Sequence, residues 1–264
     1  MNKISTRLML VVVCVCLSSL VIVAQDFQKS YRLAQGNRVS IKNVSGDVIV
    51  KGYDGEAVTI RGFKEGRDRD KLEVEDLSDG NHIDISARYP KNCNCEASIR
   101  FEVNVPRNIN LTYDAISSVS GDVEIDGAKG TVHAKAVSGD VKIINAQGTI
   151  RADSVSGDVH VERASGSVNA KSVSGDVKVN LQNVDSDEAM EFTTISGDVS
   201  VSMPSNLGAD VDLKTLSGDL KTDFGITIEK REHGPGKTAH GRLGEGSRRV
   251  KMSSVSGDVN LLKN

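Results

Sequence analysis

One tetrapeptide, Ser-Gly-Asp-Val, recurs along the chain, and in the middle of the chain its spacing is constant. Glycines follow one another at intervals of nine residues, at positions 121, 130, 139, 148, 157, 166 and 175. Residue identity repeats only every eighteen, because alternate glycines lie in Ser-Gly-Asp-Val and those between them lie in KGTV, QGTI and SGSV. The repeating unit therefore has two unlike halves, each long enough for a strand of about five residues and a turn.

Apolar and polar residues alternate within each half, as Val159 and Val161 do with His160. This alternation predicts half-buried strands. In an antiparallel meander, nothing would require every second turn to match. In a parallel β-solenoid, residue i lies over residue i+18 at about 4.7–4.9 Å, so identical residues stack. The sequence therefore predicts an all-β fold, a parallel β-solenoid or β-helix-like repeat domain with 18 residues per coil and a β-rich N-terminal cap.

Charged residues at the outward positions form columns in this arrangement. One column contains Lys135, Asp153 and Lys171, which alternate in sign, and another contains Glu124, Lys142, His160 and Lys178. Opposite charges on neighbouring strands stabilise a sheet, so we expect these columns to help hold the register and to form a solvated face.

Looser copies of the motif flank the regular zone. Downstream glycines at 197, 218 and 257 follow at intervals of 22, 21 and 39 residues, and one outlying copy lies at Gly46. We expect three parts: a signal peptide at 1–24, an N-terminal β-cap region with one outlying repeat at 25–105, and the SGDV-repeat solenoid at 106–264. The extra residues, above all those from 224 to 250, are expected to form hairpins or loops. A cap is needed because an open solenoid end is an exposed strand edge.

The N-terminus resembles an export signal. Lys3 and Arg7 precede an apolar stretch from 8 to 24, with a cleavage point before Gln25. An uncleaved membrane anchor is the alternative. We expect the protein to be exported, to the periplasm, the cell surface or the medium of a bacterium. The mature chain keeps Cys93 and Cys95, which could form a local disulfide or remain thiols, whereas a metal site needs more ligands than Cys-x-Cys supplies.

The recurring turn residues have a structural interpretation. Glycine adopts positive φ without a Cβ clash, and Ser and Asp can bond to nearby backbone amides. We assign this turn role to Gly46, Gly121, Asp122, Gly139, Asp140, Gly157, Asp158, Gly175, Asp176, Gly197, Gly218 and Gly257. The rival is a ladder of carboxylates that binds calcium. The paired glycines of calcium-binding repeats are missing, and Thr131, Thr149 and Ser167 replace Asp in alternate halves, so we assign no metal ligands.

Composition excludes several functions. The net charge is −3 and aromatic residues make up 3% of the chain, which provides neither a basic field for nucleic acid nor the rings that line carbohydrate clefts. The sequence contains no nucleophile or phosphate-binding motif. We expect no catalytic residues and no cofactor. The partner would be an envelope or surface protein or glycan, with membrane contact only through an uncleaved N-terminal segment.

Two longer segments carry a family resemblance. FEVNVPRNINLTYDAISSVSGDVEI places two strands around Pro106 before the first close-spaced repeat, and VSMPSNLGADVDLKTLSGDLKT repeats the plan around Pro204. Together with the SGDV copies, they resemble the bacterial "putative adhesin" β-strand-repeat family, a domain of unknown function, over residues 38 to 262. The resemblance implies a β-solenoid-like domain at the bacterial envelope without catalytic residues.

The sequence thus favours a secreted or cell-envelope, non-enzymatic, adhesin-like structural or binding protein. One alternative is a metal-dependent or polysaccharide-acting envelope enzyme that uses the Asp columns or the segment with His233 and His240. Another is a membrane-tethered envelope-stress component or a self-assembling scaffold. The least regular segments, 64–105 and 224–250, are the places where a distinct function is expected.

Overall fold

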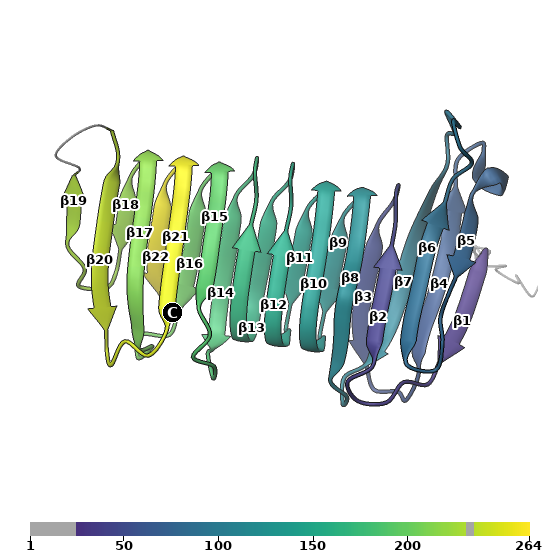
Figure 1. Cartoon of the computed structure of the whole chain (residues 1–264), viewed down its shortest axis with the longest axis horizontal. Helices are drawn as coiled ribbons and strands as arrows, with labels where there is room; N and C mark the ends of the chain where they lie inside the picture. Colours follow the sequence, from purple (N-terminus) through teal and green to yellow (C-terminus); the bar gives the residue numbers. More distant parts are fainter. Residues whose placement is uncertain (1–24, 231–234) are drawn as a thin grey trace, which may run out of the picture.

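The computed structural model describes residues 25–230 and 235–264. These residues form an elongated all-β rod of stacked coils, with 22 strands and one short 3-10 turn, η1 (Arg69–Lys71). Each regular coil contributes one strand to each of two opposed faces (Figure 1). The predicted parallel β-solenoid is confirmed.

The first face contains twelve stretches of strand, all but the outermost of them parallel. In spatial order they are β5 (Glu73–Asp76), β6 (His82–Arg88), β2 (Arg38–Lys42), β8 (Leu111–Ser120), β10 (Lys129–Ser138), β12 (Gln147–Asp153), the second half of β13 (Val159–Lys171), β15 (Met190–Ser196), β21 (Arg249–Ser256), β17 (Ala209–Ser217), β20 (Lys237–Leu243) and β19 (Ile228–Lys230).

The second face has the same construction. Its order is β1 (Phe27–Tyr31), β4 (Val58–Glu65), β7 (Ser98–Pro106), β3 (Val48–Tyr53), β9 (Val123–Asp126), β11 (Val141–Ile144), the first half of β13, β14 (Val177–Asn183), β16 (Val199–Met203), β22 (Val259–Lys263) and β18 (Leu220–Thr222).

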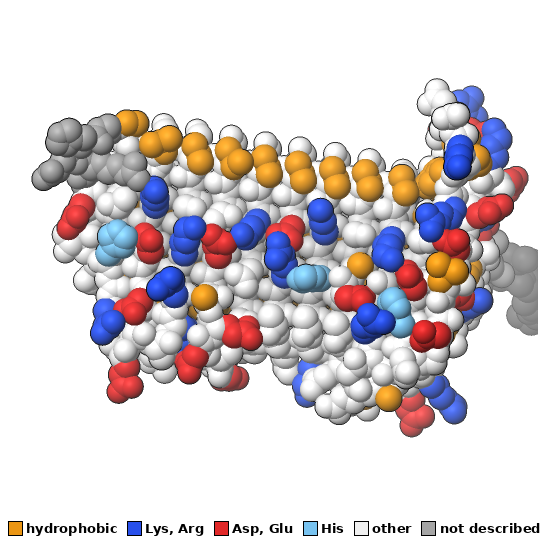
Figure 2. Space-filling view, in the orientation of Figure 1, with side chains coloured by type: hydrophobic (Ala, Val, Ile, Leu, Met, Phe, Trp, Pro, Cys, Tyr) orange, Lys and Arg blue, Asp and Glu red, His pale blue; other side chains and the backbone are white. Residues whose placement is uncertain are grey.

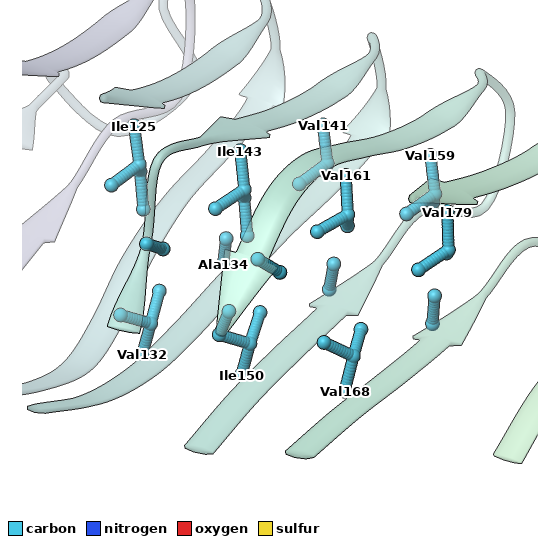
Figure 3. Packing of buried hydrophobic residues seen from close by; sticks show 14 of the residues in the cluster. Ile125, Val132, Ala134, Val141, Ile143, Ile150, Val159, Val161, Val168 and Val179 are labelled. Atoms are coloured by element: carbon cyan, nitrogen blue, oxygen red, sulfur yellow. The ribbon is translucent and has the colours of Figure 1, made fainter. Parts of the chain in front are cut away.

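The register of the regular zone is the predicted eighteen residues. Gly130 pairs with Gly148 and Gly148 with Gly166 on the first face, while Val141 pairs with Val159 on the second. The core between the faces is thin and aliphatic (Figure 3). Ile125, Ile143, Val161 and Val179 point inward from one face toward Val132, Ile150 and Val168 of the other, and these side chains are at most 3% exposed. Each such Val or Ile contributes about 1.5–3 kcal/mol through burial.

The spatial order of the coils departs from the sequence order at both ends of the rod. The last coil, β21–β22, lies between β15–β16 and β17–β18, so Gly257 stacks between Gly197 and Gly218. Near the N-terminus, β2–β3 lies between β6–β7 and β8–β9 in the same way. Each inserted coil therefore has neighbours on both sides.

Antiparallel strands cover the ends. At the N-terminal end, β4 and β1 add to β7, and β5 adds to β6. At the other end, β20 and β19, both from the segment 224–250, add to β17. The strands of residues 25–105 thus belong to the same two faces as the repeats. Within the described part of the chain, no helix is long and apolar enough to cross a membrane, and the predicted signal peptide lies outside the described residues.

A glycine series tests why the repeat requires glycine. Gly157 has φ of 155°, and a Cβ there would overlap the carbonyl oxygen of Gly139 in the preceding coil. Gly36 has φ of 83° but open space around a Cβ, and Gly80 has open space without a positive φ. Alanine should cost more than about 2 kcal/mol of unfolding free energy at Gly157, about 1–2 at Gly36 and less than about 0.5 at Gly80. Urea denaturation of the three variants measures this, and equal losses at Gly157 and Gly36 would show that the close approach is unimportant.

Candidate functional site along the SGDV edge

The most regular surface of the rod is the edge at which the first face turns into the second through Ser-Gly-Asp-Val. Three rows of side chains run along this edge. We call them the hydroxyl row (Ser118, Ser154, Ser172, Thr194, Ser254 and Thr215), the aliphatic ridge (Val44, Val119, Val137, Val155, Val173, Ile195, Val255 and Leu216) and the aspartate row (Asp47, Asp122, Asp140, Asp158, Asp176, Asp198, Asp258 and Asp219).

The aspartate row is a chain of hydrogen bonds between coils. The backbone N–H of Asp140 donates to Oδ1 of Asp122, that of Asp158 to Asp140, and that of Asp176 to Asp158, each at 2.8 Å. The pattern extends over the whole row at 2.8–2.9 Å. The carboxylates therefore do not close local turns of the Asx kind, as we expected. Instead, each one accepts the amide of the next coil.

The hydroxyl row makes a second set of contacts between coils. Oγ of Ser154 donates to the carbonyl oxygen of Gly139, and Oγ of Ser172 to that of Gly157, both at 2.9 Å. The row is buried, at 5% exposure or less, and its other members make the same bond at 2.8–2.9 Å. Such bonds contribute about 0.5–1.5 kcal/mol each. The turn glycines and aspartates are thus held by backbone and side chains of neighbouring coils.

The geometry of the carboxylates bears on the calcium hypothesis. Oδ1 of each of the first seven members of the row is already bonded to an N–H group. The amide of Asp198 and the side chain of Lys178 hold the pKa of Asp176 below its usual value, against the effect of burial. Among the described residues, no three His, Cys, Asp or Glu side chains lie together in a way that could hold a metal ion.

The remaining candidate residues lie apart from one another. Cys93 and Cys95 are joined by a disulfide in the connection from β6 to β7. His240 lies on β20, where its Nδ1 is 3.4 Å from Oδ1 of Asp212 on β17. His233 lies outside the described residues. The segment that carries the two histidines therefore shows no catalytic arrangement in its described part.

The charge columns stack as expected, but their ion pairs run in other directions. Lys135, Asp153 and Lys171 are register partners, yet Asp153 pairs with Arg151 on its own strand and Lys171 with Glu191. In the second column, His160 pairs with Glu162, again two residues along one strand. Long side chains reach a diagonal or same-strand partner as readily as the residue directly above.

The aliphatic ridge is the feature that sequence reasoning missed. Seven of its eight side chains are 40–52% exposed, and Val137 is less exposed. They form an unbroken apolar line along the edge of the rod (Figure 2). A signal was present: the residue before each Ser-Gly-Asp has the same parity as the outward residues of its strand, as Val155 has with Arg151 and Asp153, yet it is always aliphatic.

Depressions elsewhere on the rod are shallow and polar. One on the second face is lined by His160, Glu162, Arg163 and Lys178, among others. Its charged groups are engaged already, His160 with Glu162 at 2.7 Å and Lys178 with Asp176 at 3.0 Å. These contacts use the titratable groups for holding the surface together.

A pair of substitutions separates the structural role of the aspartate row from a cation-binding role. Asp158→Asn keeps an oxygen that accepts the Asp176 amide and removes a charge from a row of like charges. Asp158→Ala removes the acceptor. We expect the Asn variant to match or exceed the wild-type free energy of unfolding and the Ala variant to lose about 1 kcal/mol. A calcium-dependent rise in melting temperature of the wild type, absent in the Asn variant, would support the cation role instead.

Glu191 should make stability depend on acid pH. Lys171 at 2.5 Å and Lys251 at 2.8 Å lower the pKa of its carboxyl to about 2. Because the folded pKa is depressed, this stabilisation is complete above the usual value of 4.5 and is lost as pH falls toward 2. Since the pairs are partly exposed, we expect Glu191→Gln to cost about 1 kcal/mol at pH 7 and almost nothing at pH 2. Denaturation at several pH values tests this, with Glu73→Gln on the exposed side of β5 as the control; a pH-independent difference would contradict it.

The comparisons with known proteins agree with the architecture. No curated protein matches the chain. A solved structure of a "putative cell adhesion protein" from Clostridium sporogenes is 11% identical, with a TM-score of 0.42, and covers 90% of this chain and 99% of its own. A "putative adhesin" from Bacteroides fragilis is 14% identical, with a TM-score of 0.36, and covers 90% and 96%. Residues 28–262 match one family over nearly all of the described chain, and the protein belongs to that family, Toastrack DUF4097.

Proposed function

We propose that the protein is an exported, non-enzymatic structural or binding module of the bacterial cell envelope, with an adhesin-like role. The observation that carries this proposal is the use of the polar groups of the rod. Hydrogen bonds of the aspartate and hydroxyl rows join one coil to the next, and the long faces between them are flat and regular. Such a surface suits contact with an extended partner more than turnover of a small substrate.

The titratable groups with the largest pKa shifts support the same interpretation. Burial raises the pKa of Tyr31 to about 12. Burial would also raise the pKa of Asp76, but Lys29, Ser78 and Tyr31 together lower it. The Tyr31 hydroxyl donates to Oδ2 of Asp76 at 2.7 Å, which ties β1 of the second face to β5 of the first. These groups are directed at one another across the capped end, and they fasten the cap.

The position of the N-terminus fits a surface module. β1 lies at one end of the rod, and β19 and β20 lie at the opposite end (Figure 1). A chain that leaves the N-terminal segment at Gln25 therefore begins at one end. Whether that segment is cleaved or remains as an anchor, the faces and the far end stay open to a partner.

Fractionation tests the export on which this function depends. We expect the full chain, produced in a bacterial host, to appear in the envelope or the medium, and a variant without residues 2–24 to stay in the cytoplasm. N-terminal sequencing of the exported chain should begin at Gln25 if the segment is cleaved. Cytoplasmic retention of the full chain would contradict the proposal.

A binding assay tests the non-enzymatic part. The purified exported chain is applied to immobilised glycans and envelope proteins, and also incubated with a panel of soluble polysaccharides. We expect saturable binding that EDTA does not alter and no release of reducing ends. Turnover of a polysaccharide would instead support the enzyme alternative, and EDTA-sensitive binding would support the metal-dependent one.

A further inference from the structure

The aliphatic ridge has no partner within the described chain. It contains eight Val, Ile or Leu side chains in a straight row, and the regular coil spacing of about 4.8 Å gives it a length of about 34 Å. Single exposed aliphatic residues are common on proteins, but a contiguous exposed row marks an interaction surface. The turn does not require these side chains, because Gly, Asp and the hydroxyl row make its contacts.

The spacing of the ridge restricts what can cover it. Residues on one side of an extended peptide repeat at about 6.6–6.8 Å, and those on one side of a helix at about 5–6 Å. Neither interval stays in step with side chains about 4.8 Å apart over eight positions. Another stack of β-coils has the same interval, so its side chains can interlock with the ridge along the whole length.

Charge differs on the two sides of the ridge. On the side of the first face lies a column that contains Lys42, Lys135, Lys171 and Lys214, and within the described residues Lys135 and Lys214 have no ion-pair partner. On the other side lies the aspartate row. Asp176 pairs with Lys178 and Asp219 with Lys237, but the other six carboxylates have no cationic partner in the described part of the chain.

This asymmetry selects one arrangement of two copies. A two-fold axis parallel to the ridge brings the basic column of each copy against the aspartate row of the other, whereas a two-fold axis across the ridge opposes like columns. Isologous contact of this kind is the commonest form of homodimer. In the favoured arrangement each level of one rod meets the same level of the other, so Lys135 faces Asp140 of the second copy.

We propose that the aliphatic ridge is a homodimer interface, in which two rods pack side by side with their coils running in the same direction. The ridge alone is narrower than a standard interface of about 800 Å² per partner, so the flanking rows take part and the dimer is of moderate affinity, with a micromolar Kd. This proposal concerns self-association and does not depend on the envelope ligand.

Sedimentation velocity over a concentration series tests the interface, with the purified exported chain. We expect a reversible dimer. The triple variant Val155→Thr, Val173→Thr and Ile195→Thr keeps β-branched side chains at exposed sites and should raise the dimer Kd at least about tenfold with little change in melting temperature. The matched control is Ile228→Thr, an exposed aliphatic residue on β19 away from the ridge, which should leave the Kd unchanged.

Two further variants test the charge argument. Lys135→Glu places a negative charge against the aspartate row of the second copy and should raise the Kd by about tenfold. Lys129→Glu makes the same change on the same strand, β10, but at the opposite edge, and should have no effect.

Single cysteines test the direction of the rods. Val119→Cys and Val255→Cys lie toward opposite ends of the ridge. With the coils running in the same direction, each variant should cross-link to itself under mild oxidation. In the opposite arrangement neither would, and only a mixture of the two variants would cross-link.

Three outcomes would overturn the proposal. They are a wild-type chain that stays monomeric at all concentrations, a dimer that the ridge variants leave intact, and cross-linking of the mixed cysteines alone. A monomeric chain that sediments with phosphatidylcholine vesicles, and loses this property in the triple threonine variant, would assign the ridge to a lipid surface instead.

Discussion

The contact on which the structure depends is the hydrogen bond from the amide of one turn aspartate to the carboxylate of the next. It recurs at 2.8–2.9 Å along the SGDV edge. The turn glycines allow it, because a Cβ on Gly157 would overlap the carbonyl oxygen of Gly139. The same carbonyl accepts Oγ of Ser154 at 2.9 Å. Each turn is therefore stabilised by its neighbours, and the rod behaves as a stack in which one coil supports the next.

The sequence was sufficient to predict the regular zone because this contact demands the same residues at every level. Identity at eighteen residues implied that residue i lies over i+18, and Val141 indeed pairs with Val159. Alternation separated inward Val161 from outward His160 correctly. The aliphatic core also followed, since a narrow space between two faces leaves no room for many aromatic rings. Membership of the Toastrack family covers the same part of the chain.

Other features could not be predicted because equivalent turns carry no information about order. Gly197, Gly218 and Gly257 have the same local sequence, so nothing in the turn reveals that the coil of Gly257 lies between the other two. The insertion depends on core side chains, such as Phe192 on β15 and Met252 on β21, which are register partners and fully buried. Ion pairs were also beyond the pattern, because flexible side chains such as Arg151 reach along their own strand.

The covering of the ends explains why the side of the rod is the surface left for association. An uncovered solenoid end would favour growth from end to end, since its strands have free hydrogen-bonding groups. Here β1 and β5 close the N-terminal end with antiparallel strands, and β20 with β19 closes the first face at the other end, where the second face stops at the three-residue β18. Short and antiparallel edges disfavour addition of another parallel coil. The aliphatic ridge has no such protection, so self-association of this rod is expected through its side.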